Sequence, residues 1–340
     1  MQNFEAFHEL ISSPKKIAII THPKPDADAL GSSLGLAGYL RKKNHSVDVI
    51  TPTDYPKFLQ WMTGNETVIN FETAGNTEKA TQIFTQADII FCLDFPSLSR
   101  IGEIGDIIRA SPAIKVLIDH HLEPEPFAHY TLSHTIAAAT CQLIYELIAD
   151  LGDADDIDIG IAECLYAGIM TDTGSFKHSN TTKQVHLICA DLIDRGVAIT
   201  KINRLVYDTN TEERMRFLGF ALKDKLTVLP QYRVAYFALS AEELEQYHSQ
   251  TGDTEGLVNY GLSVENIIFS ALFAEREGGI RISFRSVGDF SVNDFARKHF
   301  NGGGHKNAAG GKSSLSLQET VATFLAAMPQ YQQQLNVSDK

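Results

Sequence analysis

Carboxylates and histidines recur along the first 172 residues at points where an apolar run ends. The candidate ligands are His22, Asp26, Asp28, Asp94, Asp119, His120, His121 and Asp172. A mixed set of carboxylate oxygens and imidazole nitrogens suits Mn²⁺ or a related divalent ion better than Ca²⁺, which prefers oxygen ligands alone. Two such ions about 3.5–4 Å apart promote in-line displacement at phosphorus, because a water that bridges them becomes hydroxide near neutral pH. The residue types therefore predict a two-metal site that acts on a phosphate ester.

The spacing of Asp26 and Asp28 fits this chemistry. In an extended segment, residues two apart point to the same side, so each carboxylate can offer an oxygen to a different metal. Taken singly, each candidate also has an ordinary structural explanation: Asp-x-Asp as a helix N-cap, Asp94 as a strand-end turn, and Asp172 as a helix stop. The occurrence of all of them at predicted strand or helix ends favours the metal site.

Short apolar runs that alternate with helical patterns must position these residues. The expected strands are 16–21, 47–51, 87–94 and 115–119, and the expected helices are 29–43, 136–151, 157–170 and 182–195. Runs this short and this continuously apolar suit strands buried on both faces of a parallel sheet. We therefore expect an α/β fold, with a mostly parallel sheet flanked by helices. Ligand sites of such sheets form outside the carboxyl ends of the strands, where residues distant in sequence converge.

The C-terminal part carries a second group of strands and a glycine-rich segment. The expected strands are 232–239, 267–273 and 280–285, with helices at 292–300 and 317–328, which predicts a smaller α/β domain. Gly302, Gly303 and Gly304 precede His305, and successive glycines let backbone N–H groups form an anion-binding nest. From residue 279 to 312, six Lys or Arg stand against two acids, a local charge of +4 that leaves −17 for the rest. An anion site is therefore expected, with a solvated basic loop as the alternative.

Two other motifs match only in part. Residues 31–35 (GSSLG) have the pattern of a nucleophile elbow, but that serine must directly follow a strand, and several residues intervene here. These glycines are expected instead to let the helix pack closely on the sheet. Residues 311–313 (GKS) do not form a P-loop, because the upstream glycine is replaced by Lys306.

The composition is that of a globular chain with two domains. Of 340 residues 44% are hydrophobic, and 29 Lys and Arg against 42 Asp and Glu give a net charge of −13. Such a chain is poorly suited to hold long nucleic acid, because phosphate contacts need Lys and Arg to displace counterions. Its four cysteines form no Cys-x-x-Cys pair, which predicts reduced thiols. Without a signal peptide or an apolar run of about 20 residues, we expect a cytoplasmic protein with no membrane partner.

Together these residues resemble the DHH phosphoesterase superfamily. The set His22-x-x-Pro25-Asp26-x-Asp28, Asp94, Asp119-His120-His121 and Asp172 is similar to its metal-binding motifs, in the same order. Residues 302–310 (GGGHKNAAG) resemble the signature of its DHH-associated C-terminal domain. Length and layout are most similar to the bacterial nano-RNA phosphodiesterases, which also remove the 3′-phosphate of 3′-phosphoadenosine 5′-phosphate (pAp). Lys24 and Ala27 differ from the Asn and Gly of many relatives, but neither is a ligand.

The resemblance implies a role for each candidate residue. One Mn²⁺ would be held by His22, Asp26 and Asp94, and a second by Asp28, Asp94, His120 and Asp172, so that Asp94 bridges the two ions. As catalytic residues, Asp119 would orient a histidine and His121 would face the scissile phosphate. Arg285, Gly302, Gly303, Gly304 and His305 would bind substrate phosphate. The implied domains are a catalytic domain at 1–195, a helical connector at 196–226 and a substrate-binding domain at 227–340.

The expected function is hydrolysis of short single-stranded oligoribonucleotides (nano-RNA) to mononucleotides, and of the 3′-phosphate of pAp, by metal-activated hydroxide attack on phosphorus. A linear or cyclic dinucleotide phosphodiesterase, an inorganic pyrophosphatase and a single-strand exonuclease would share the metal centre. The net charge argues against a processive exonuclease, and a pyrophosphatase of this superfamily lacks the Gly-Gly-Gly-His segment. A non-catalytic nucleotide- or RNA-binding protein is the alternative from a different class. The oligomeric state is open, a homodimer included.

Overall fold

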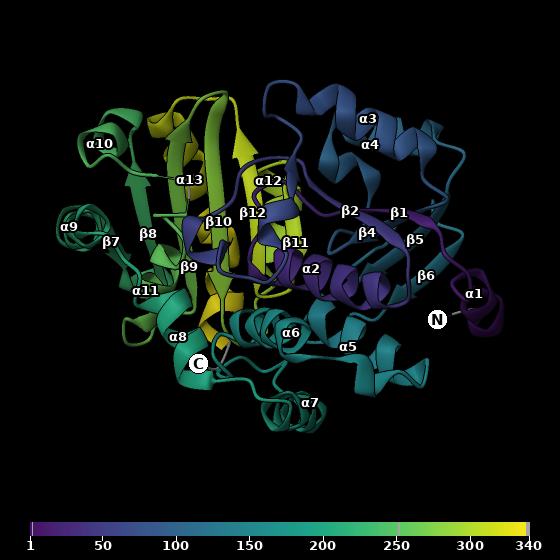
Figure 1. Cartoon of the computed structure of the whole chain (residues 1–340). Coiled ribbons are helices and arrows are strands. Elements are labelled where there is room, and N and C mark those ends of the chain that lie inside the picture. Colours follow the sequence, from purple (N-terminus) through teal and green to yellow (C-terminus); the bar gives the residue numbers. More distant parts are fainter. Residues whose placement is uncertain (2, 251, 338–340) are drawn as a thin grey trace. The chain divides into compact units, whose positions relative to one another are not determined.

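The computed structural model describes residues 1, 3–250 and 252–337 and contains two compact units, Met1–Thr209 and Asn210–Lys340 (Figure 1). The division falls inside the expected connector 196–226. Helix α8 (Ile199–Tyr207) belongs to the first unit and α9 (Glu212–Phe220) to the second. Among the described residues, no helix is both long enough and apolar enough to traverse a lipid bilayer.

The first unit is built on a six-stranded parallel sheet with the strand order β3-β2-β1-β4-β5-β6. The strands are β1 (Lys16–Ile20), β2 (Ser46–Thr51), β3 (Ile69–Asn70), β4 (Ile89–Leu93), β5 (Ile114–Asp119) and β6 (Tyr130–Ser133). Every residue of β4 is buried. This agrees with the prediction that continuously apolar strands belong to a sheet covered on both faces. The expected α/β fold is confirmed. The edge strands β3 and β6 were not predicted, because they are short and lack a continuous apolar run.

Helices cover both faces of this sheet. They are α1 (Phe4–Leu10), α2 (Ala27–Lys42), α3 (Asn76–Gln86), α4 (Glu103–Ala110), α5 (Thr140–Asp150), α6 (Ile159–Asp172) and α7 (Lys183–Asp194), with single-turn helices at Lys57–Leu59, Asn65–Thr67, Leu98–Ile101 and Ala154–Asp156. One face packs against α2, α5 and α6, where Ile19 of β1 lies in the same core as Leu34 and Leu165. The other face packs against α3 and α4, where Ile90 of β4 contacts the core formed with Phe84 and Ile108.

The glycines of α2 pack this helix against α6. A Cβ atom added to Gly31 would lie 2.5 Å from the carbonyl oxygen of Cys164, and one added to Gly35 would lie 2.8 Å from Cδ2 of Leu165. The expectation that these glycines face the sheet was therefore wrong. Their absence of side chains lets α2 and α6 approach closely, which fixes the N-terminus of α2 beside the C-terminal half of α6.

The second unit has its own six-stranded sheet with the order β11-β12-β10-β9-β8-β7, in which only the β8–β9 pair is parallel. Its strands are β7 (Leu226–Leu229), β8 (Val234–Leu239), β9 (Phe269–Arg276), β10 (Gly279–Ser286), β11 (Gly303–His305) and β12 (Ala308–Ser313). Its further helices are α10 (Ala241–Gln246), α11 (Leu257–Ser263), α12 (Val292–His299) and α13 (Leu317–Val337), with a π-helical turn at Ala221–Lys225 and a 3₁₀ turn at Pro230–Tyr232. Phenylalanines of α12 and α13 fill the core on one face, and α9, α10 and α11 form a second core on the other.

Candidate metal centre

The first unit brings eight predicted ligands and catalytic residues to one edge of its sheet. His22 follows β1, Asp94 follows β4, and Asp119 ends β5 with His120 and His121 directly after it. Because β1, β4 and β5 are adjacent and parallel, their carboxyl ends lie together. Helices supply the remaining members: Asp26 and Asp28 begin α2, and Asp172 ends α6.

Asp94 is at the centre of this cluster. Ligand atoms lie within 4.8 Å of one another in three groups, namely His22, Asp26 and Asp94; Asp28, Asp94 and His120; and Asp94, Asp119 and His121. Nε2 of His22 is 3.4 Å from Oδ2 of Asp94, whereas Nε2 of His120 is 3.5 Å from Oδ1. The two carboxylate oxygens thus face different histidines, which is the arrangement expected of a residue that bridges two cations.

The backbone at Asp94 is strained. Its φ of 64° lies in the left-handed region, which Asp and Asn tolerate better than most residues with a side chain. The side chain is almost completely buried, and its Oδ1 accepts a hydrogen bond of 2.9 Å from the hydroxyl of Thr140. A sparsely populated backbone conformation that surrounding contacts hold in place is typical of functional sites.

Asp26 and Asp28 do not form the extended pair expected from their spacing. Asp26 is the N-cap of α2, where its Oδ1 accepts hydrogen bonds of 3.0 Å from the N–H groups of Asp28 and Ala29. Asp28 lies in the first helical turn and is fully buried. Its carboxylate accepts from the backbone N–H groups of Thr140 at 2.6 Å and Cys141 at 2.8 Å. Because the helix starts here, the carboxylates of Asp26 and Asp28 contact different neighbours. The alternative that Asp26 is a helix N-cap is confirmed.

Backbone carbonyls orient two of the histidines. Nδ1 of His22 lies 3.0 Å from the carbonyl oxygen of Pro23, and Nδ1 of His120 lies 3.1 Å from that of Ala137. A carbonyl can only accept, so each Nδ1 carries the proton and each Nε2 faces the carboxylates. Nε2 of His120 is 3.3 Å from Oδ2 of Asp172 and 3.7 Å from Oδ2 of Asp28. Both rings thus present toward the acidic cluster an Nε2 that could bind a metal.

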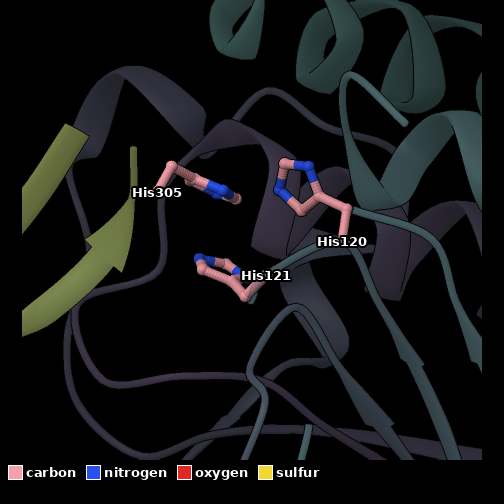
Figure 2. Close-up of side chains that lie close together, drawn as sticks. All are labelled: His120, His121 and His305. Carbon is pink, nitrogen blue, oxygen red and sulfur yellow. The ribbon is translucent and has the colours of Figure 1, made fainter. Parts of the chain in front are cut away.

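His121 has a different partner. Its Nδ1 donates to Oδ1 of Asp119 over 2.7 Å, and Asp119 is fully buried. Figure 2 shows the rings of His120 and His121, whose centroids are 5.0 Å apart with an interplanar angle of 74°. Asp119 therefore contacts His121, whereas His120 is held by a backbone carbonyl.

Burial and neighbouring charges shift the pKa values of the cluster. Burial opposes a charge on His22, but Asp94 and Asp26 outweigh it and raise the pKa of His22 to about 9. Burial raises the pKa of Asp26 to about 6, with His22 acting in the opposite direction. Burial and the charge of Asp94 hold the pKa of Asp28 well above its usual value. Carboxylates concentrated in a buried site resist ionisation unless positive charge is near, so the donor set fits divalent cations.

The predicted phosphate-binding residues lie in the second unit. Arg285 is on β10, and Gly303, Gly304 and His305 form β11. The side chain of His305 is shown in Figure 2. The glycine segment was expected to be a nest, but it forms a hairpin with β12. The N–H of Gly304 donates to Oδ1 of Asn293 over 2.9 Å, and that of Gly302 donates to the carbonyl of Ala296.

Close packing explains why this hairpin needs glycine. A Cβ atom on Gly302 would lie 2.0 Å from the carbonyl oxygen of Gly310. The register pairs His305 with Ala308, and Ala308 with Arg285, so these three residues form one row across three strands. Arg285 and His305 therefore lie in the same row of the sheet, on two strands that β12 separates.

Sequence reasoning did not identify Thr140 or Gly168 as parts of the site. Thr140 contacts Asp28 through its backbone N–H and Asp94 through its hydroxyl. A Cβ atom on Gly168 would lie 2.9 Å from Cα of Asp28 and 2.3 Å from Sγ of Cys141. Neither residue type signals metal chemistry, since one acts largely through its backbone and the other through the lack of a side chain.

Comparisons with known proteins agree with the layout of the two units. Residues 16–169 match the model of the DHH family, N-terminal domain, and residues 232–334 match the DHHA1 domain. A curated relative from Thermus thermophilus, named bifunctional oligoribonuclease and PAP phosphatase NrnA, is 31% identical over 92% of this chain and 89% of its own length. The cyclic-di-AMP phosphodiesterase GdpP of Geobacillus thermodenitrificans is 24% identical over 96% of this chain and 49% of its own. The crystal structure of an exopolyphosphatase-related protein from Bacteroides fragilis has 39% identity and a TM-score of 0.92, covering 98% of this chain and 97% of that one.

Proposed function

Because the chain belongs to the DHH family of phosphoesterases, we propose that it hydrolyses short oligoribonucleotides to mononucleotides and removes the 3′-phosphate of pAp, with two divalent cations as cofactors. The observation that carries this proposal is the position of Asp94, whose two carboxylate oxygens face different histidines. The name of the Thermus thermophilus relative supports this substrate class.

The proposed ligands form two sets that share Asp94. His22, Asp26 and Asp94 hold one cation, and Asp28, Asp94, His120 and Asp172 hold the other, with Mn²⁺ as the proposed ion. When bound, such ions supply Lewis-acid polarisation of a phosphoryl oxygen and neutralise negative charge. The chain contributes a rigid frame, because helix caps, backbone carbonyls and the hydroxyl of Thr140 fix the ligands before substrate binds.

His121 is the proposed general acid. Asp119 accepts from its Nδ1 and fixes the orientation of the ring, which leaves Nε2 to deliver a proton to the departing oxygen. Asp119 acts through His121 and is a positioning residue. In the second unit, Arg285 and His305 bind a non-reacting phosphate of the substrate, since a guanidinium can donate two parallel hydrogen bonds to it.

A Mn²⁺ titration and an activity panel test the proposal. Isothermal titration should detect Mn²⁺ binding that Asp94→Asn abolishes and that Asp155→Asn, a change at an exposed acid, leaves intact. With Mn²⁺, the protein should hydrolyse di- to pentaribonucleotides and pAp, while Asp94→Asn should not. Mn²⁺ binding that is unaffected by Asp94→Asn contradicts the ligand assignment, and a lack of hydrolysis of every RNA and of pAp contradicts the function.

A dinucleotide phosphodiesterase is the second candidate, favoured by the similarity to GdpP along 96% of this chain. The same panel separates the two, with cyclic di-AMP, its linear product and pyrophosphate added. Faster turnover of cyclic di-AMP than of trinucleotides or pAp identifies the second candidate. Binding of nucleotides without any turnover identifies a non-catalytic binding protein.

A further inference from the structure

The residues of β10 alternate between a buried and an open face. Ile280, Ile282 and Phe284 are buried in the core that α12 and α13 complete. The residues between them point to the opposite face, namely Arg281, Ser283 and Arg285, of which Arg281 is exposed. Both charged residues on the open side of this strand are therefore arginines.

The strands on either side of β10 add a third cation and no acid. In β12, Lys312 pairs with Arg281, Gly310 with Ser283, and Ala308 with Arg285. In β9, the corresponding partners are Ala274, Leu272 and Ser270. Partners in a ladder point to the same face, so every charged side chain in these three rows is basic.

Helices cover the β9 part of these rows, whereas the β12 part is exposed at Gly310 and Lys312. Leu272 and Ala274 lie in the core formed with α9, α10 and α11. A Cβ atom on Gly261 of α11 would lie 2.1 Å from the hydroxyl of Ser270, which places that helix directly over the strand. By contrast, Gly310 of β12 is exposed, and a Cβ atom there would meet only the carbonyl oxygen of Ile282, at 3.7 Å. The open surface begins at β10.

Arg281 and Lys312 are available for a ligand. Both are exposed, and within the described part of the chain neither forms an ion pair. This differs from Lys306 of the hairpin, whose Nζ lies 2.8 Å from Oδ1 of Asp289. Two basic side chains on paired positions, beside the small residue Gly310 and with no acid in their rows, suit a phosphate group.

We propose that Arg281 and Lys312 form a second phosphate-binding subsite, which receives a backbone phosphate of 5′-phosphorylated oligoribonucleotides of three or more nucleotides. The proposal rests on the proposed function, in which one phosphate reacts and a second lies on Arg285 and His305. A strand rises about 3.3 Å per residue, so the four residues from Arg281 to Arg285 span about 13 Å. A further phosphate is needed to occupy the distal pair, and pAp and a 5′-phosphorylated dinucleotide carry only two.

The test compares substrates of different length with charge-removing variants. Arg281→Gln, Lys312→Gln and the double variant should lower kcat/KM for 5′-phosphorylated tri- to pentaribonucleotides about 10-fold or more, as expected for loss of charge-assisted hydrogen bonds. The kcat/KM values for pAp and for a 5′-phosphorylated dinucleotide should not change. The slope of log KM against log salt for the pentamer should also become shallower, by roughly 0.7 for each phosphate that the variant no longer neutralises.

Lys298→Gln is the matched control, because Lys298 lies on α12, over the ring of Tyr331, and belongs to none of the three rows. It should leave all substrates unaffected. An equal loss on pAp and the pentamer, or no loss at any length, overturns the subsite. If the wild-type protein hydrolyses none of these compounds, the proposed function fails, and fluorescence anisotropy of a labelled pentaribonucleotide decides the subsite alone. Binding of the pentamer should then weaken in the double variant but not in Lys298→Gln, and equal binding by the two variants overturns it.

Discussion

The hydroxyl of Thr140 donates a hydrogen bond of 2.9 Å to Oδ1 of Asp94, linking the start of α5 to the end of β4. The same residue donates its backbone N–H to Asp28. One threonine therefore orients two carboxylates that belong to the proposed ligand sets, although it has no ligand atom of its own in them.

Replacing Thr140 by valine should weaken metal binding and leave the fold intact. Valine has nearly the same shape and keeps the backbone bond to Asp28, but it cannot donate to Asp94. Loss of a partner that orients a ligand costs about 10–100-fold in metal affinity. Isothermal titration of Mn²⁺ measures this, with Thr85→Val at an exposed position of α3 as the control. An unchanged affinity in Thr140→Val contradicts the role assigned to this hydroxyl.

His121→Gln should lower kcat about 10²–10⁴-fold on oligoribonucleotides, the range expected for loss of a general acid. Metal affinity should not change. A p-nitrophenyl phosphodiester has a leaving group that departs without a proton, so the loss of kcat on this substrate should be much smaller. Parallel rate measurements on both substrates check this. Equal losses on the two substrates indicate that His121 does not deliver the proton.

Gly168→Ala should destabilise the first unit. The added methyl group would lie 2.3 Å from Sγ of Cys141 and 2.9 Å from Cα of Asp28, so α2 and α6 must separate. Such overpacking costs about 1–3 kcal/mol and should also weaken Mn²⁺ binding, since Asp28 moves. Trp61 is the single tryptophan of the chain and lies in the first unit, so its fluorescence during urea unfolding follows this change.

Gly219→Ala is the control for that substitution. Gly219 lies in α9, and a Cβ atom there would meet no other group within 4 Å. This variant should leave the Trp61 transition unchanged and stabilise α9 by roughly 0.5–1 kcal/mol. If Gly168→Ala behaved in the same way, the close contact between α2 and α6 would not matter for stability.

His45 should make the first unit less stable in mild acid. Its Nδ1 accepts from the N–H of Lys15, and burial lowers the pKa of the His45 imidazole below its ordinary 6.5. The unfolded chain therefore takes up the proton first. The stability from the neutral ring is fully present above pH 6.5 and is lost as the pH falls toward the folded pKa.

The difference between wild type and His45→Gln isolates this effect. Urea unfolding followed by Trp61 fluorescence at pH 7.5 and pH 5.5 should show that the difference in unfolding free energy between the two proteins narrows at the lower pH. Other titrating groups contribute equally to both proteins, so they cancel. A difference that does not change with pH shows that His45 is not the group responsible.

Residues that directly follow a buried strand could be placed from the sequence. Asp94, Asp119 and His120 come after apolar runs that could only be central strands, and parallel strands end at one edge of the sheet. Their proximity therefore followed from topology alone. The shared row of Arg285 and His305 could be predicted from the sequence only in part. The pairing of β10 with β12 depends on a glycine-rich hairpin, and this hairpin has no strand-like pattern.

The orientation of individual side chains could not be predicted in this way. Asp28 was predicted to lie in an extended segment. Asp26 instead caps α2, which begins at Ala27, and this helical start places the side chain of Asp28 in the core. The role of Thr140 depends on where α5 begins, and the predicted helix 136–151 started too early. Local propensity locates an element to within a few residues, whereas a ligand's direction changes by about 100° with each residue of a helix.

The starts of α2 and α5 have a consequence for the order in which the protein is assembled. Asp26 caps α2, and Asp28 accepts the first N–H groups of α5, so the positive ends of two helix dipoles offset part of the charge of these carboxylates. We therefore expect the first unit to fold without a bound cation, unlike small zinc domains that remain unfolded without their metal. We also expect the proposed cations to bind to an already folded unit, so that a chelator should remove them reversibly without unfolding it.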